Sequence, residues 1–204
     1  MMVSFVFCLW VLLTVAIAVV WSVCLSQPAW VLHPNNNLHS FGLQKYCVVD
    51  IRGSVDDLVK PIKKTCFPYG NALRMGDLPS EYWRASFLLF SSGTFLLIVS
   101  VTIGVLSVFM QEKWDGYVSM MTKCVQTIAV LVAVSALLTY PLGFGSPFFR
   151  YYCGAEAGPY NTGHCSMGWT YMLAIMGASL SVFCPILWNF RRIKHYDIID
   201  EIFV

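Results

Sequence analysis

Cysteines are the residues of this chain with the clearest potential for chemistry, and there are eight of them. Four stand in polar stretches, where thiols form disulfides if the stretch lies in the secretory lumen: Cys47, Cys66, Cys153 and Cys165. Four cysteines permit three pairings, and the sequence does not choose among them. We favour the pairing within each stretch, Cys47 with Cys66 and Cys153 with Cys165, and each bond would contribute about 3 kcal/mol in the chain-entropy model.

The other four cysteines lie in or beside apolar runs, where a free thiol packs as a small hydrophobic group. They are Cys8, Cys24, Cys124 and Cys184. We interpret them as core residues, and palmitoylation of Cys8, Cys124 or Cys184 is the alternative.

One pair of adjacent residues could take part in catalysis or metal binding, His164 and Cys165. No third ligand or orienting carboxylate is adjacent, so we interpret His164 as a loop residue next to a disulfide cysteine. The apolar runs hold no paired acids or relay of ionisable groups, which a pump or transporter usually needs. The sequence therefore predicts no enzyme, no metal site and no cofactor.

The composition is that of a membrane protein. The 204 residues are 57% hydrophobic and 12% charged, which is about half the charge of a soluble domain. The net charge of +2 is too small and too scattered to predict a nucleic-acid partner. We expect the partners to be the lipid bilayer and other proteins.

Four apolar runs are long enough to cross a bilayer, which takes about 20 helical residues. They cover residues 3–25, 87–110, 118–140 and 167–190 of one tetraspan domain, 1–204. The first run lacks a basic n-region and is too long for a cleaved signal, so we expect a signal anchor. Lys123 is the one charge inside a run, and it lies close enough to the end of the run to snorkel.

Basic residues predict the orientation of these four crossings. Arg191, Arg192 and Lys194 directly follow the fourth run, which is where the positive-inside rule places a cytoplasmic anchor. The basic residues of the long first loop count for little in that rule. We therefore expect a multi-pass protein of the plasma membrane with both termini cytoplasmic. Residues 111–117 and 191–204 would then be cytoplasmic, and the loops 26–86 and 141–166 extracellular.

The first loop contains segments typical of strands. Residues 28–32 and 41–49 are rich in aromatic and β-branched side chains and are separated by a Pro/Asn-rich break. Residues 65–69 could form a third strand, which Pro68 would confine to a sheet edge. Three strands suffice for a small sheet braced by a disulfide.

Tryptophans near the ends of the runs are typical of aromatic belts at the membrane interface. We expect Trp83, Trp114, Trp169 and Trp188 in such belts. Ser80 is the expected N-cap of the second helix, and Pro185 predicts a kink late in the fourth.

The tail carries two short recognition patterns. Tyr196 to Ile199 resembles a tyrosine-based sorting signal, and Ile202 and Val204 alternate as in a ligand that extends a PDZ sheet edge. In the fourth run, Gly177 and Ser181 permit close helix approach, either inside the bundle, which we favour, or against a partner's helix.

Short motifs recur in order along nearly the whole chain. The second loop and fourth run contain Tyr140-Pro141-Leu142-Gly143, Cys153-Gly154, Gly163-His164-Cys165 and Gly168-Trp169. The first loop contains Pro28-Ala29-Trp30, Phe41-Gly42-Leu43, Tyr46-Cys47, Cys66 and Pro79-Ser80 with Trp83. In order and spacing this set resembles the lipoma-HMGIC-fusion-partner-like (LHFPL) tetraspan family of the claudin-like group, although Phe144 stands where the family usually has Trp.

The resemblance implies an all-α membrane protein with a small β ectodomain: a four-helix bundle with a claudin-like extracellular sheet from the first loop. It also implies an accessory subunit that helps to assemble, traffic or localise an ion channel or receptor, as relatives do in hair cells and at synapses. Claudin-like adhesion is the alternative, and a homo-oligomer is a further candidate. The candidate interface residues are Trp30, Phe41, Leu43, Tyr46, Trp83, Gly177 and Ser181.

Overall fold

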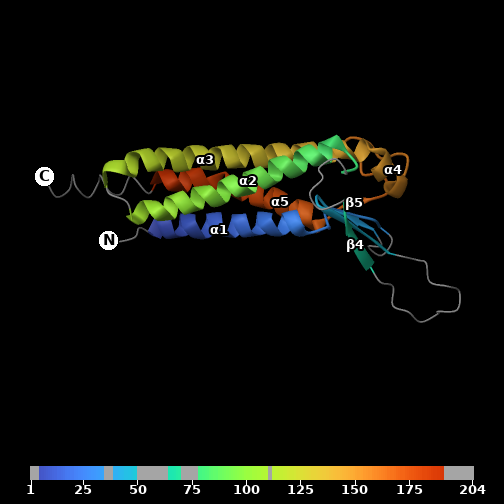
Figure 1. Cartoon of the computed structure of the whole chain (residues 1–204), viewed down its shortest axis with the longest axis horizontal. Coiled ribbons are helices and arrows are strands. Elements are labelled where there is room, and N and C mark those ends of the chain that lie inside the picture. Colours follow the sequence, from blue (N-terminus) through green and yellow to red (C-terminus); the bar gives the residue numbers. More distant parts are fainter. Residues whose placement is uncertain (1–4, 35–38, 50–63, 70–77, 110–111, 191–204) are drawn as a thin grey trace. The chain divides into compact units, whose positions relative to one another are not determined.

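The computed structural model of the chain describes residues 5–34, 39–49, 64–69, 78–109 and 112–190 (Figure 1). Within these residues, four helices are long and apolar enough to cross a membrane. They are Phe5–Ser26, Glu81–Phe109, Gly116–Gly145 and Trp169–Phe190. A small antiparallel sheet accompanies them. The predicted fold class, a four-span helical membrane protein with a small sheet, is confirmed.

The helical elements follow the apolar runs closely. They are α1 (Phe5–Ser26), α2 (Glu81–Leu106) with the 3-10 turn η2 (Ser107–Phe109), α3 (Glu112–Thr139) with the 3-10 helix η3 (Tyr140–Gly145), the short α4 (Pro147–Cys153) and α5 (Trp169–Ser181). Large apolar side chains such as Leu12, Phe95 and Leu131 are exposed on the long helices. Lipid tails solvate such faces, so these helices belong in a bilayer.

Pro185 interrupts the last helix. The regular helix gives way to a turn at Val182 and resumes over residues 183–190. Proline has no N–H for the carbonyl four residues earlier, which here is that of Ser181. The interruption lies within one turn before Pro185.

The chain divides into two compact units, which we describe separately. Unit 1 comprises Met1–Ser22, Phe90–Val134 and Ile175–Val204, and unit 2 comprises Val23–Leu89 and Ser135–Ala174. Unit 2 contains both connections of interest, the first between α1 and α2 and the second between α3 and α5.

Unit 1 has a polar and aromatic core. Trp10 Nε1 donates to Gln126 Oε1 at 3.2 Å, and Gln126 Nε2 donates to Thr14 Oγ1 at 3.4 Å. The ring of Trp188 lies 4.4 Å from that of Trp10, and its Nε1 donates to Ser119 Oγ at 3.0 Å. Trp188 is only 2% exposed, so its predicted place in an aromatic belt is wrong.

Small residues in unit 1 serve packing within the chain. A Cβ at Gly104 would collide with the Trp10 ring, and one at Gly177 would meet the indole of Trp21 at 2.7 Å. Ser181 is fully buried and its hydroxyl donates to Ala178 O at 2.6 Å. Packing inside the bundle is thus the role of Gly177 and Ser181 in this structure.

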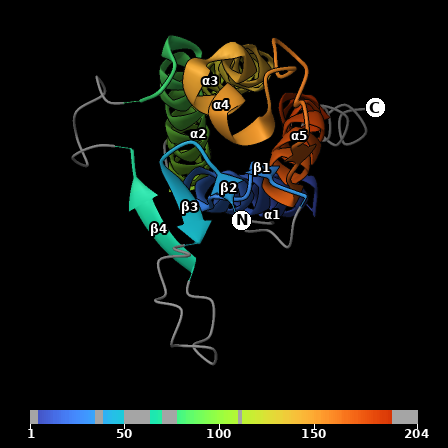
Figure 2. The same ribbon diagram turned by 90° about the vertical axis from the view of Figure 1, so that its right-hand side faces the viewer.

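Unit 2 is built on a five-stranded sheet of order β4-β3-β2-β1-β5, in which all pairs are antiparallel. Figure 2 shows β4, β3, β2 and β1 of this sheet, and β5 is labelled in Figure 1. The strands are β1 (Val31–Leu32), β2 (Ser40–Phe41), β3 (Lys45–Val49), β4 (Lys64–Pro68) and β5 (Ser166–Met167). The sheet joins the two connections, because β5 comes from the second and pairs with β1 of the first.

Two expectations about this sheet need correction. The single strand expected over 41–49 is divided by a turn, in which Gly42 N donates to Lys45 O at 3.0 Å. A Cβ at Gly42 would meet Gln27 O at 2.6 Å, so only glycine fits this turn against the end of α1. The expected sheet came from the first loop alone, whereas β5 belongs to the second.

The edge position expected for Pro68 is confirmed, because β4 is the last strand of the sheet. Tyr69 N donates to Gln44 O at 3.3 Å, and hydrogen-bonded pairs alternate from there along an antiparallel ladder. Pro68 opposite Lys45 is therefore a non-hydrogen-bonded pair. Its nitrogen faces away from β3, so the ladder loses no donor.

Candidate functional site

Two disulfides brace unit 2. Cys47 in β3 is bonded to Cys66 directly opposite in β4, with a Cα–Cα distance of 3.9 Å. This is a non-hydrogen-bonded pair by the same alternation, and such pairs bring side chains closest. Cys153, at the end of α4, is bonded to Cys165, next to β5. The structure thus contains the pairing within each connection.

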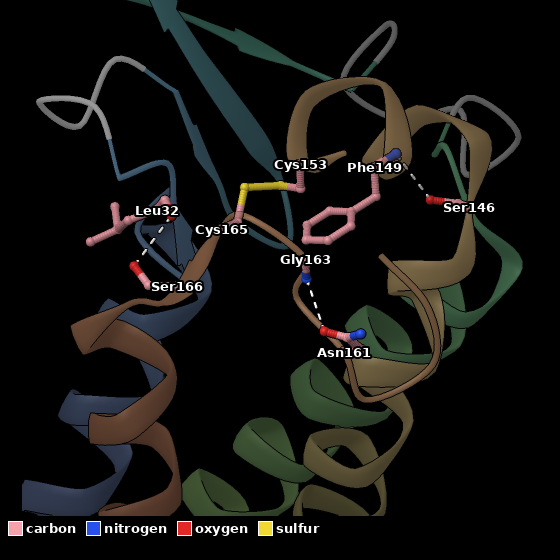
Figure 3. Close-up of a disulfide and its surroundings, with 8 residues drawn as sticks. All are labelled: Leu32, Ser146, Phe149, Cys153, Asn161, Gly163, Cys165 and Ser166. Carbon is pink, nitrogen blue, oxygen red and sulfur yellow. Dashed lines mark hydrogen bonds between the residues drawn. A yellow bond between two sulfur atoms is a disulfide. The ribbon is translucent and has the colours of Figure 1, made fainter. Parts of the chain in front are cut away.

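The second disulfide closes a tightly hydrogen-bonded connection (Figure 3). Asn161 Oδ1 accepts from Gly163 N at 3.1 Å, and His164 N donates to Cys153 O at 2.8 Å. Gly163 has a φ of 58°, a conformation that favours glycine. Ser166 Oγ donates to Leu32 O at 3.3 Å, which ties this connection to β1. These bonds link the connection to α4 on one side and to β1 on the other.

Helix α4 begins with a recognisable cap. Ser146 is the N-cap, and its Oγ accepts from Phe149 N at 3.4 Å (Figure 3). Pro147 occupies the first turn. Both choices stabilise a helix start, because the serine satisfies a free N–H and proline has none to satisfy.

Beneath the sheet, unit 2 has an aromatic core. Trp83 stacks on Tyr140 with ring centroids 5.6 Å apart and an interplanar angle of 11°, and Trp30 lies 4.9 Å from Tyr140. Trp30 Nε1 donates to Cys24 O at 2.8 Å. A Cβ at Gly143 would collide with the indole of Trp83, so the ring packs where a side chain at position 143 would otherwise lie.

Three consecutive carbonyls at the end of α3 accept hydroxyl groups from other elements. Ser86 Oγ donates to Ala136 O, Tyr171 OH to Leu137 O and Tyr160 OH to Leu138 O, each at 2.9 Å. Pro141 explains the second bond: it lies four residues after Leu137 and has no N–H for that carbonyl. The hydroxyl of Tyr171 takes the place of the missing donor.

Above the core, α4 covers one face of the sheet with aromatic contacts. Phe148 and Phe149 lie 5.9 and 6.0 Å from Phe41, measured between ring centroids. From there a continuous row of ring contacts leads to the surface. We call it the aromatic ridge, and it consists of Phe67, Tyr46, Phe148, Tyr152 and Tyr151.

The ridge ends in exposed side chains on both sides. Tyr151 on α4 is 82% exposed and Phe67 on β4 is 45% exposed. Burial, with Tyr46 and Tyr151 as lesser causes, raises the pKa of Tyr152. Burial also raises the pKa of Tyr69, which stacks on Tyr46 at 5.2 Å. The phenols of Tyr152 and Tyr69 therefore stay neutral at physiological pH.

The structure moves most of the sequence-predicted interface residues into the core. Trp30, Phe41 and Trp83 are fully buried and Leu43 is 1% exposed, so these side chains do not form a surface. Trp83 accordingly does not belong to an aromatic belt, whereas Trp169 is 52% exposed. Tyr46 remains partly accessible within the ridge.

Some predicted residues lie outside the described part of the chain. These are the tail residues Tyr196, Ile199, Ile202 and Val204. The ridge residues on α4 were missed, although the run Phe148-Phe149 and Tyr151-Tyr152 in a polar loop was a usable signal.

The remaining His, Cys, Asp and Glu side chains are of the types that can act as metal ligands. Within the described residues, no group of three or more of these side chains could hold a metal ion, and His164 is an exposed residue beside the disulfide. Cys184 is buried, so palmitoylation does not suit it. Cys8 and Cys124 are exposed.

Comparison with known proteins agrees with this architecture. A zebrafish (Danio rerio) protein, LHFPL tetraspan subfamily member 2a, is 31% identical over 59% of this chain and 53% of its own length. The human member 2 protein is 30% identical over 52% of its length, so the chain spans about half of these two relatives. Member 7 of Xenopus tropicalis is 29% identical, with 95% of this chain and 96% of that protein covered.

The family comparison covers nearly all of the described residues. The family described as lipoma HMGIC fusion partner-like protein matches residues 6–190, from the start of α1 to the end of the last helix. The matched range contains three of the four spans in full, the first span from its second residue on, both disulfides and the aromatic core with Trp83 and Tyr140. This chain is a multi-pass membrane protein that belongs to the lipoma HMGIC fusion partner-like (LHFPL) tetraspan family.

Proposed function

We propose that the chain is a non-enzymatic accessory subunit of the plasma membrane, which binds an ion channel or receptor and helps to assemble, traffic or localise it. The observation that supports this most is the aromatic ridge. It places an 82% exposed tyrosine, Tyr151, on a helix that a disulfide holds in place. Exposed aromatic side chains on a rigid base are typical of the residues that dominate binding at protein interfaces.

In this proposal unit 2 lies outside the cell and both termini lie in the cytoplasm. The two disulfides support the extracellular placement of unit 2, because disulfide bonds persist in the secretory lumen and outside the cell. Arg191 and Arg192, directly after the last span, support cytoplasmic termini. The tail would then offer Tyr196 to Ile199 to a sorting adaptor and Ile202 to Val204 to a PDZ domain.

The mechanism we propose is rigid presentation. The sheet, α4 and the two disulfides fix the ridge before a partner arrives, so binding costs little ordering of the loop. The aromatic core below joins this face to the helix ends, because Trp83 and Tyr140 stack within the same unit. A partner that contacts the ridge can therefore meet both the loops and the adjoining helix ends.

Affinity purification with quantitative mass spectrometry tests this proposal. The full-length chain should recover a channel or receptor subunit, and truncating a hot-spot side chain by Tyr151→Ala should reduce the recovery at least tenfold. Glu156→Gln, an exposed change in the same connection, is the matched control and should change nothing. Surface delivery of each variant is measured in parallel. Recovery of identical copies alone would contradict the proposal and favour a homo-oligomer.

Claudin-like adhesion is the second candidate function. It is favoured by β4, the edge strand of the sheet, which carries the 45% exposed Phe67. A sheet edge with an exposed ring can contact a protein on a neighbouring cell. Expression in non-adherent cells should then produce cell contacts that Phe67→Ala weakens, and dispersed cells at full surface expression would rule adhesion out.

A further inference from the structure

A four-residue turn in the second connection has an unusual backbone. Gly158 N donates to Asn161 O at 3.0 Å and Asn161 N donates to Gly158 O at 2.8 Å, which closes the turn. Between them, Tyr160 has a φ of 61° and is the only non-glycine residue with a positive φ in the described part of the chain. A bulky side chain rarely adopts this conformation. Such outliers persist where the surroundings impose them, and they often mark functional positions.

The surroundings of Tyr160 fix it against the end of α3. Its N–H donates to Pro141 O at 3.2 Å and its hydroxyl donates to Leu138 O at 2.9 Å. The Asn161 side chain holds the turn from the other side, donating from Nδ2 to Glu156 O at 3.1 Å. The ring therefore lies along the last turn of α3 instead of pointing away from it.

That last turn belongs to a membrane-spanning helix and faces outward. Leu138, whose carbonyl accepts the Tyr160 hydroxyl, has a side chain that is 59% exposed. Its helix is one of the four with the length and hydropathy to cross a bilayer, over Gly116–Gly145. Tyr160 itself is 60% exposed. A polar loop thus places an aromatic side chain against the last turn of α3, near the end of the apolar span Gly116–Gly145.

Other exposed aromatic residues of unit 2 stand at the ends of spanning helices in the same way. Tyr82 is in the first turn of α2 and Trp169 is the first residue of α5, and each is 52% exposed. Tyrosine and tryptophan favour the headgroup layer because their rings enter the acyl boundary while their polar atoms stay hydrated. Tyr160 shares this chemistry but is placed by a loop.

We infer that the turn 158–161 lies on the bilayer surface and that Tyr160 inserts its ring into the phospholipid headgroup layer. The strained conformation of Tyr160 and its hydrogen bond to Leu138 O are what direct the ring toward lipid. The partner of this surface is the lipid itself, because the exposed face next to it is the apolar side of a spanning helix. The inference does not depend on which side of the membrane unit 2 occupies.

Hydroxyl-radical footprinting of the native chain in phosphatidylcholine nanodiscs gives the first test. If protein burial alone set the oxidation of the two tyrosines, Tyr160 at 60% exposure and Tyr151 at 82% would react in a ratio of about 0.7. Contact with headgroups should lower this ratio at least about threefold, because lipid excludes water from the ring. A ratio near that set by burial would overturn the inference.

A photo-crosslinking experiment identifies what covers the ring. p-Benzoylphenylalanine placed at position 160 should form phospholipid adducts in the same nanodiscs, and the same group at position 151 should form few. Adducts at position 160 to a copurifying protein, or equal lipid adducts at both positions, would overturn the inference. Footprinting uses the unmodified chain, so it decides the question even if the substituted chain at position 160 does not fold.

Discussion

The hydrogen bond from Tyr171 to the end of α3 offers the sharpest test of how unit 2 is held together. Tyr171→Phe removes the hydroxyl that donates to Leu137 O at 2.9 Å. Pro141 supplies no N–H in its place. Tyr171 is only 8% exposed, so water does not reach the carbonyl freely. The carbonyl should therefore lose its donor without a substitute.

The expected cost follows from that geometry. Leaving a buried carbonyl without a donor costs about 1–3 kcal/mol. The aromatic packing should change little, because phenylalanine keeps the ring that lies 5.7 Å from Tyr140 and 5.7 Å from Trp30. For a chain of this size, each kcal/mol shifts the melting temperature by about 2–4 °C.

Two matched variants separate this effect from simple loss of a hydroxyl. Tyr160→Phe removes a bond of the same length, but Tyr160 is 60% exposed, so polar surroundings can replace its hydroxyl and the cost should be about 0.5 kcal/mol. Ser86→Ala removes the hydroxyl that donates to Ala136 O. It should cost about 1 kcal/mol, because this carbonyl still accepts the helical hydrogen bond from the N–H of Tyr140, four residues later.

Unfolding in mixed micelles, followed by tryptophan fluorescence, measures the order of the three variants. Tyr171→Phe should be the least stable. If it matched the native chain, or if Tyr160→Phe cost more, the replacement of the missing Pro141 donor by Tyr171 would be refuted.

Three further predictions concern unit 2. Cys165→Ser should retain the chain in the secretory pathway, because the lost disulfide stabilises by about 3 kcal/mol; surface biotinylation measures this, and normal delivery would contradict it. Gly143→Ala should cost about 1–3 kcal/mol in chemical unfolding, because the added methyl group collides with Trp83. Gly158→Ala is the control and should change stability by no more than about 0.5 kcal/mol, because a Cβ there meets no atom within 4 Å. Equal costs would refute the packing argument. Burial raises the pKa of Tyr69 above its ordinary 10.0, so the contribution of this phenol to stability should be constant below pH 10 and should be lost above it, where the unfolded phenol ionises first. Tyr69→Phe should lessen the loss of stability at alkaline pH in chemical unfolding, and an unchanged pH profile would count against this.

Features with a strong local signal could be predicted from the sequence. Long apolar runs predicted the four spans because the bilayer allows few other structures for such segments. Pro68 predicted an edge strand because a proline in a central strand would break the ladder. Each of these signals depends on one segment and needs no knowledge of its neighbours.

Features that depend on distant partners could not be predicted in the same way. Strand β5 has two residues, too few for any alternating pattern, and exists because β1 pairs with it. Trp83 looked like an interfacial residue because it stands at a helix start, but Gly143 makes room for its ring in the core. Helix α4 did have local signals in Ser146 and Pro147, and these were overlooked.

The pairing of β1 with β5 imposes an order of assembly during synthesis. Val31 pairs with Met167, so this part of the sheet cannot form until the ribosome has added 136 further residues (167 − 31). At a synthesis rate of about 5–20 residues per second, that delay is roughly 7–27 s. Strands β2, β3 and β4 can pair long before, leaving one edge of β1 open until the last helix begins. That open edge distinguishes an unfinished chain from a finished one, and a chaperone that binds extended strands would release it only when β5 arrives.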